Sequence, residues 1–249
     1  MLPLSAIAYG TPPEGCVGKF ENLGLKLLKT VEADCKVGPF GSVCSGYIGL
    51  IHAKKAIVLA FRGTTNIWQL LEELKAAFEK VEFLDEDHGE VHPLFLKGVE
   101  NVFINSELQP LLALLLEKYP DYEIYITGHS LGGALAGLTA TWLSNIMPGI
   151  KDRIVLYTFG QPRIGTLQFV KYLASMNFTY YRVSNGDDIV TCVATTLLGY
   201  HHAGTEVLYT NDKHEEYYGD KGCSMKTRTN LMPHTHYFGR RVGEFCSSG

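Results

Sequence analysis

A serine lies between two glycines in the segment Gly128-His129-Ser130-Leu131-Gly132, which fits the pattern G-x-S-x-G. The apolar run 122–127 precedes it, and small and apolar residues follow it with helical spacing. A serine raised above the end of a strand needs a sharp, strained turn, and glycines two residues before and after it remove side chains that would collide. The helix that follows directs free amides at the serine, which favours a developing oxyanion. The pattern therefore indicates a nucleophile, and the alternative is a tight structural turn.

A serine hydroxyl becomes a good nucleophile only when a histidine accepts its proton and a carboxylate orients that histidine. In chains with a strand-turn-helix nucleophile, the acid and then the histidine follow the serine in sequence. The candidate acids are Asp187 and Asp188, on a turn-rich segment after the apolar run 178–184. The candidate histidines are His201, His202, His214, His234 and His236. Residue types alone do not show which aspartate and which histidine act with Ser130. No regular metal-ligand spacing occurs among them, so we expect no metal site, and we expect His92 and His129 to be structural.

The elements that must position these residues are short apolar runs separated by helical patterns. The runs that we expect to form strands are 46–53, 55–63, 122–127, 153–160 and 178–184. The central runs are almost continuously apolar, as expected of strands that are covered on both faces. Helical spacing occurs over 94–118, after Ser130, and over 166–176. This alternation predicts an α/β fold with a mainly parallel central sheet and helices on both faces, formed by residues 1–249 as one domain.

Composition and charge exclude several classes of protein. Apolar residues make up 46% of the 249 residues and charged residues 19%, which is ordinary for a folded domain and unlike a disordered chain. The formal net charge is −4 and the basic residues form no stripe or tail, so we expect no nucleic-acid partner. No apolar run approaches the ~20 residues of a membrane span. The first ten residues lack the charged and long apolar regions of a signal peptide.

The cysteines bear on the compartment in which the protein works. There are six, at Cys16, Cys35, Cys44, Cys192, Cys223 and Cys246, and they form no CxxC or zinc-finger pattern. Six buried thiols in a cytosolic protein are one possibility. We favour disulfides and secretion, since the chain also contains the glycosylation sequon Asn177-Phe178-Thr179.

The sequence alone does not choose among the fifteen pairings that six cysteines allow. Cys35 and Cys44 are close in sequence, with two glycines and a proline between them, so we expect them to close a short loop. For the other four cysteines we expect the pairs Cys192–Cys223 and Cys16–Cys246. The last pair would join the two ends of the domain.

Several separated motifs resemble those of the fungal-type class 3 lipases, a family of α/β-hydrolases that includes secreted triacylglycerol lipases. They occur in the family's order: AIVLAFRGT (56–64), YITGHSLGGALA (125–136), YTFGQPRIG (157–165), RVSNGDDIV (182–190) and HTHYFG (234–239). In that family the triad aspartate directly precedes an Ile-Val pair, and the histidine lies three residues before a Tyr-Phe-Gly. The resemblance therefore implies Asp188 as the acid and His234 as the base. It also implies an oxyanion hole formed by Thr64 and the amide of Leu131.

This resemblance implies a serine hydrolase that cleaves carboxylic esters of lipids, with acylglycerols as the expected substrates and without cofactor or metal. Other hypotheses are a feruloyl esterase or phospholipase of the same fold, and a lipase-like binding protein without turnover. Two positions depart from the family pattern: Thr191 replaces a common proline, and Leu94 a usual glycine. We expect these changes to alter loop shape and acyl-chain preference. We also expect an extracellular monomer that acts at a lipid–water interface.

Residues 65–74 follow the oxyanion position, where related lipases have a helical lid, and we expect them to form a short amphipathic lid over Ser130. One side of this segment is apolar and includes Ile67, Trp68 and Leu71, while the other carries glutamine and glutamates. An ordinary helix docked on the core would have the same pattern. The stretch 72–90 carries eight acidic residues and two lysines, so we expect neutral acylglycerol to be preferred over an anionic phospholipid surface.

Overall fold

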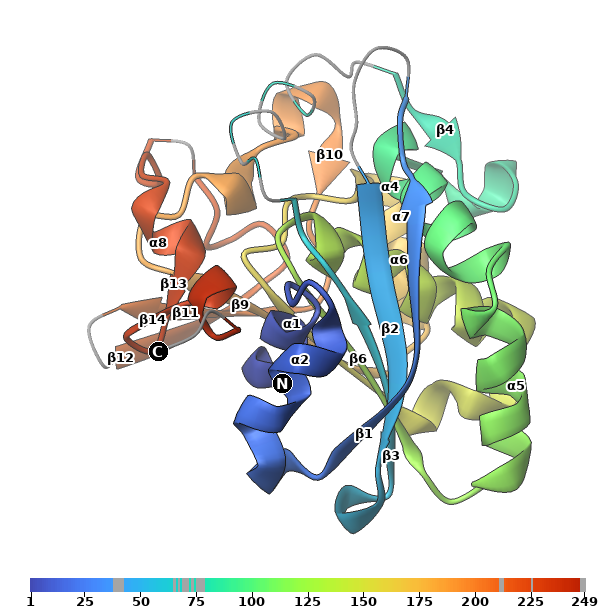
Figure 1. Ribbon diagram of the computed structural model, residues 1–249. Coiled ribbons are helices and arrows are strands. Elements are labelled where there is room, and N and C mark those ends of the chain that lie inside the picture. The colour runs from blue at the N-terminus through green and yellow to red at the C-terminus, as the bar shows by residue number, and fades with distance from the viewer. Residues whose placement is uncertain are drawn as a thin grey trace.

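The computed structural model describes residues 1–37, 43–64, 66, 68, 72, 74, 79–210, 213–224 and 226–246. Within these residues the main sheet has eight strands in the order β1-β2-β3-β6-β7-β9-β11-β12 (Figure 1). The strands are β1 (Leu25–Asp34), β2 (Val43–Ile51), β3 (Ala56–Phe61), β6 (Glu123–His129), β7 (Ile154–Phe159), β9 (Thr179–Asn185), β11 (Thr205–Thr210) and β12 (Lys213–Tyr218). All pairings from β3 to β11 are parallel, and those at the two ends of the sheet are antiparallel.

Helices cover both faces of this sheet (Figure 1). One face packs against α4 (Pro93–Val99), α5 (Leu108–Lys118), α6 (Leu131–Ile146) and α7 (Leu167–Ser175). The other face packs against α1 (Leu2–Ile7) and α2 (Pro13–Val17). In β3, residues Ile57 and Leu59 contact the first set of helices, and Val58 and Ala60 belong to the cluster under the second. Because both faces are covered, every residue of β3 is buried, which explains its unbroken apolar run.

Shorter elements complete the described part of the chain. A small sheet has the order β10-β8-β5-β4, and β13 pairs with β14. Their bounds are β4 (Val81–Glu82), β5 (Glu90–Val91), β8 (Gly165–Thr166), β10 (Tyr200–His201), β13 (His236–Tyr237), β14 (Arg240–Arg241) and the short helix α8 (Met232–Thr235). Short 3-10 helical segments lie at Gly18–Leu23, His52–Lys54, Glu86–His88, Pro148–Arg153, Val190–Cys192, Thr196–Leu198 and Val242–Glu244, and a π-helical turn lies at Glu100–Ile104. Of the helices in the described ranges, none combines the length and hydrophobicity that a membrane span requires.

The predicted α/β fold with a mainly parallel sheet is confirmed, but the helical pattern over 94–118 is not one helix. The structure divides it into α4, a π-helical turn at Glu100–Ile104, and α5. Ser106 lies at the break, where its hydroxyl donates to the Val102 carbonyl at 2.7 Å and accepts the amide of Leu108 at 3.1 Å. This side chain supplies hydrogen bonds that a continuous helix would make through its backbone.

The six cysteines are joined in the three expected pairs. Cys16–Cys246 joins α2 to the last described residues, and Cys35–Cys44 connects the ends of β1 and β2. Cys192–Cys223 joins the segment after β9 to the segment after β12, with 5.6 Å between the Cα atoms. This third disulfide lies close in sequence to Asp188, so it restrains the loop that carries the candidate acid.

Candidate active site

Ser130 occupies a sharp turn between β6 and α6, with φ 59° and ψ −127°. Few L-amino acids adopt a positive φ, so the surrounding chain must hold this conformation. A Cβ atom at Gly128 would lie 2.1 Å from the carbonyl oxygen of Gly132, and one at Gly132 would lie 2.2 Å from that of Phe61. Both glycines are therefore required by the close approach of backbone to backbone. The turn raises Ser130 above the carboxyl end of β6, as the G-x-S-x-G pattern predicts.

Asp188 and His234 are buried partners that come from segments distant in the sequence. The His234 Nδ1 atom lies 2.9 Å from Oδ2 of Asp188, and both side chains are at most 1% exposed. A carboxylate accepts hydrogen bonds, so Nδ1 carries the proton and Nε2 keeps a free electron pair. Among the described residues, His234 Nε2 and Ser130 Oγ are both buried without a hydrogen-bond partner.

The backbone of Ser130 and the ring of His234 both lie against the loop at Phe159 and Gly160. The amide of Ser130 donates to the Phe159 carbonyl at 2.8 Å. At the next residue, Gly160, φ is +58° and a Cβ atom would lie 2.8 Å from Cε1 of His234. His129, which precedes the serine, has its ring 4.6 Å from that of His234, measured between centroids. The structure thus places the His234 ring against the same loop that the backbone of the serine turn contacts.

The backbone of the candidate acid is held by a chain of buried side chains. Thr191 donates its hydroxyl to the Asp188 carbonyl at 2.8 Å and accepts from Arg228 Nη1 at 2.7 Å. The same Nη1 donates to Glu206 at 2.6 Å, and Ser184 also donates to that carboxylate at 2.6 Å. Thr191 is one of the two positions that depart from the pattern which the sequence resembles, and the proline of that pattern has no hydroxyl to donate. Its hydroxyl links the Asp188 loop to a buried ion pair.

His129 supports the candidate base without being able to act as one. Its Nε2 donates to the His234 carbonyl at 2.7 Å, so its Nδ1 must accept the hydrogen bond from the Tyr9 hydroxyl at 2.6 Å. Burial, reinforced by the nearby His234, lowers the pKa of His129 to about 3. His129 is therefore neutral at ordinary pH and structural, as expected. The sequence pattern gave no sign of Tyr9, because its partner lies 120 residues away.

The remaining candidate histidines have other partners. His201 Nδ1 lies 2.8 Å from Asp220, and buried His202 donates to the Thr191 carbonyl at 2.7 Å. Burial, with nearby arginines, lowers the pKa of His202 well below its usual value. His214 is exposed on β12, two strands away from β9.

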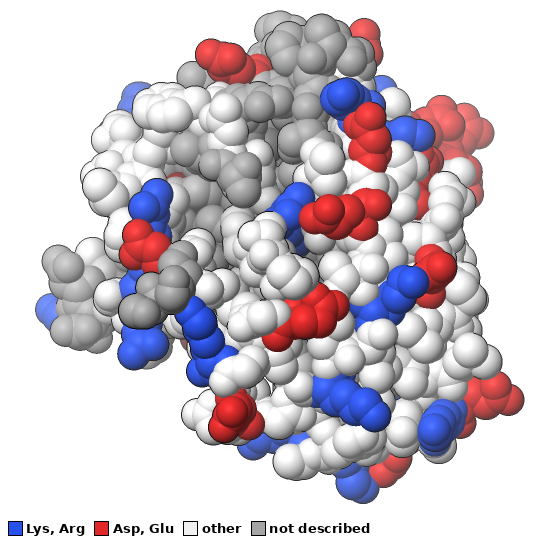
Figure 2. Space-filling view, viewed as in Figure 1, with Lys and Arg blue, Asp and Glu red and all other residues white. Residues whose placement is uncertain are grey.

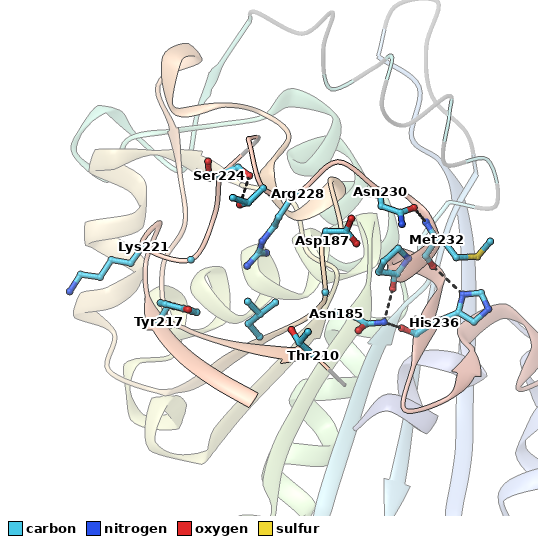
Figure 3. Close-up of a pocket in the computed structure, with 15 residues that line it drawn as sticks. Asn185, Asp187, Thr210, Tyr217, Lys221, Ser224, Arg228, Asn230, Met232 and His236 are labelled. Carbon is cyan, nitrogen blue, oxygen red and sulfur yellow. Dashed lines mark hydrogen bonds between the residues drawn. The ribbon is translucent and has the colours of Figure 1, made fainter. Parts of the chain in front are cut away.

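His236 and Asp187 line a hollow on the outer side of the candidate loops, and Figure 3 shows both of them there. Asn185 fixes the backbone in this hollow by donating to the His236 carbonyl at 2.6 Å. His236 Nδ1 lies 3.0 Å from the Met232 carbonyl oxygen, which it uses as a hydrogen-bond partner in place of a carboxylate. His234 and His236 thus lie in different surroundings, and of the two only His234 contacts Asp188.

The residues expected to form the oxyanion hole lie at the same end of the sheet. Leu131 is the first residue of α6, where backbone amides have no acceptor within the helix. Thr64 follows Gly63, whose backbone approaches the serine so closely that a Cβ atom there would lie 3.1 Å from Ser130 Cβ. Of the expected lid residues, Ile67 and Leu71 lie outside the described residues. Trp68 is described and is 67% exposed.

Comparisons with known proteins identify the family of this chain. Residues 58–197, which include Ser130 and Asp188, match the family model described as lipase (class 3). The chain belongs to the class 3 lipase family. It is 30% identical to "Lipase ZK262.3" of Caenorhabditis elegans over 100% of this chain and 80% of that protein. It is 32% identical to a lipase of Rhizomucor miehei over 77% of this chain, but it covers 54% of that lipase's own length.

Solved structures of lipases have the same fold. The Rhizomucor miehei triacylglyceride lipase superposes with a TM-score of 0.86 at 28% identity, covering 99% of this chain and 94% of that one. A triacylglycerol lipase whose catalytic centre is described as a serine protease triad superposes with a TM-score of 0.84 at 27% identity, with the same coverage. These neighbours extend the likeness beyond residue 197, so it includes the segment that carries His234.

Proposed function

We propose that this protein is a secreted serine hydrolase that cleaves carboxylic esters of acylglycerols. The observation that carries the proposal is the buried Asp188–His234 contact, which leaves His234 Nε2 without a partner, together with the buried and unpartnered hydroxyl of Ser130. The names of the relatives support the lipid substrate, since they are lipases of animal and fungal origin.

Acyl transfer begins when His234 Nε2 accepts the hydroxyl proton and Ser130 Oγ attacks the ester carbonyl carbon. Asp188 holds the imidazole in the tautomer with Nδ1 protonated and stabilises its positive charge once Nε2 is protonated. The negative charge on the carbonyl oxygen is stabilised by the amides of Thr64 and Leu131. His234 then gives the proton to the leaving alcohol, and an acyl-enzyme remains.

Water then hydrolyses the acyl-enzyme, with His234 again acting first as base and then as acid. His234 takes a proton from water, the hydroxide attacks the acyl carbon, and Ser130 leaves with the proton returned by Nε2. No atom in this scheme requires a cofactor or metal. His129 stays neutral throughout and fixes the His234 backbone through the carbonyl contact.

Charge on the surface is consistent with a neutral lipid substrate. Lysine and arginine are interspersed with acidic side chains on the face shown in Figure 2, and no continuous basic patch is visible there. Together with the acidic stretch 72–90, this distribution favours neutral acylglycerol over anionic phospholipid. We further propose that the protein acts as a monomer at a lipid–water interface, with Trp68 as an exposed aromatic contact.

Hydrolysis of a matched ester panel tests this proposal. Tri- and diacylglycerols, phosphatidylcholine and a feruloyl ester are compared at equal interfacial or molar concentration. We expect acylglycerols to be hydrolysed at about ten times the rate of the other esters. A preference for phosphatidylcholine or the feruloyl ester would show that the proposed substrate class is wrong. Absence of turnover on all esters would favour a binding protein.

A further inference from the structure

Asn177 belongs to the chain's single Asn-X-Ser/Thr sequence, Asn177-Phe178-Thr179. This tripeptide is the acceptor of N-linked glycans in secreted proteins. Asn177 precedes β9, whereas Asp188 follows its other end. Seven strand residues span about 20 Å, so the sequon lies at the opposite end of the sheet from the candidate active site. A glycan there leaves the approach to Ser130 free.

The folded chain presents both acceptor residues to solvent. Asn177 and Thr179 are exposed, while Phe178 between them is partly buried and packs against the larger core. The Asn177 side chain makes no hydrogen bond to any residue in the described ranges. Its amide nitrogen is therefore available, and a sugar attached to it displaces no contact within the protein.

Backbone conformation supplies a competing reason for asparagine at position 177. This residue follows the C-terminus of α7 with φ 57°, a left-handed conformation in which glycine and asparagine are favoured. That reason does not extend to Thr179, which is an exposed first residue of β9. The two explanations are separable, because glycine at 177 keeps the conformation and removes the acceptor amide.

A hollow beside Asn177 is suited to the first sugar. Asn177 lines it together with Tyr181 and Tyr218. Strand pairing places Tyr181, Thr205 and Tyr218 in one row across β9, β11 and β12. Tyr218 is 59% exposed, which leaves an aromatic face uncovered next to the sequon. The apolar face of a pyranose ring packs favourably against such a ring.

We propose that Asn177 carries an N-linked glycan whose first N-acetylglucosamine lies in this hollow against Tyr218. A bond forms between Asn177 Nδ2 and C1 of the sugar, and the bond between C1 and the diphosphate of a lipid-linked oligosaccharide breaks. The proton lost from the amide leaves with the lipid diphosphate. The three disulfides support this modification, because disulfides form in the same secretory compartment. The proposal does not depend on ester hydrolysis.

The test is the intact mass of the full chain secreted from insect cells, before and after amidase treatment that removes N-linked glycans. The wild type is expected to carry a mass that begins with two N-acetylhexosamines, located to the Asn177 peptide. Asn177→Gly and Thr179→Val should lose this mass, and Thr179→Ser should keep it. Secreted wild type with an unmodified Asn177 peptide would overturn the proposal.

A stability cycle tests the position of the sugar. Tyr218→Ala should lower the midpoint of thermal unfolding by about 2–4 °C more in the glycosylated protein than in the Asn177→Gly background. An equal shift in both backgrounds would show that the sugar does not contact Tyr218. Ester hydrolysis by Asn177→Gly should equal that of the wild type, so failure of this proposal is distinguishable from failure of the proposed function.

Discussion

Thr191→Val removes one hydroxyl and keeps the size of the side chain, so it isolates the link between Asp188 and Arg228. The hydroxyl donates to the Asp188 carbonyl at 2.8 Å and accepts from Arg228 Nη1 at 2.7 Å. Valine leaves that carbonyl without the threonine donor, whereas Arg228 keeps its bond to Glu206. A buried polar group left unsatisfied costs about 1–3 kcal/mol. We therefore expect the free energy of unfolding to fall by about 1–3 kcal/mol.

Activity should fall as well, because the loop that carries Asp188 loses a restraint. Small misplacement of an orienting group costs about tenfold to a hundredfold in rate, so kcat on a soluble short-chain ester should fall by about that factor. The free energy of unfolding is measured by urea denaturation and kcat by initial rates. Thr191→Ser retains the hydroxyl and should keep both values near those of the wild type.

Thr141→Val is the matched control, since it also removes a buried threonine hydroxyl. Thr141 lies within α6 and donates to the Gly137 carbonyl at 2.9 Å, without contact to the candidate triad. It should cost stability without lowering kcat by more than twofold. A Thr191→Val protein with wild-type kcat, or a Thr141→Val protein with an equal loss of kcat, would refute the positioning argument.

Three further predictions concern other parts of the molecule. His234→Ala should abolish turnover while His236→Ala keeps a measurable fraction, since His234 contacts Asp188; the reverse order of rates would contradict this. Burial lowers the pKa of His92 to about 4. Below pH 6.5 this histidine is therefore protonated in the unfolded state but not in the folded state, so the free energy of unfolding decreases as the pH falls from 6.5 to about 4. His92→Asn keeps an acceptor for the Leu94 amide and should reduce that dependence by about 1.4 kcal/mol per pH unit in urea denaturation; an unchanged slope would disprove it. Trp68→Ser should weaken the rise in activity as an ester passes its solubility limit more than it weakens hydrolysis of the dissolved ester, and equal losses would exclude an interfacial role.

Burial on both faces made the central strands predictable. The strand β3 is a continuous apolar run because helices cover both sides of the sheet, and the expected ranges for β3, β6 and β7 overlap the strands that form. The edge strand β12 has the sequence KHEEYY and is mostly exposed, so no hydrophobic pattern marks it. It is held by pairing with β11, which depends on the rest of the fold.

The site was predictable where local sterics demand a particular residue. Glycines 128 and 132 are required by the serine turn, and that requirement is visible in the sequence. Asp188 and His234 needed the family resemblance, because Asp187 and His236 are chemically equivalent neighbours. The buried pair Glu206–Arg228 could not be expected, since charged side chains are usually exposed and these two meet only after folding.

Reaction with a fluorophosphonate, followed by peptide mass analysis, tests the central claim most directly. The account predicts one covalent adduct on the peptide that contains Ser130, and loss of both adduct and ester hydrolysis in a folded Ser130→Ala variant, with kcat/KM reduced by about 10³-fold or more. Folding of the variant is checked by circular dichroism. An adduct on a different residue, or a Ser130→Ala protein that keeps activity within about tenfold of the wild type, would contradict the account.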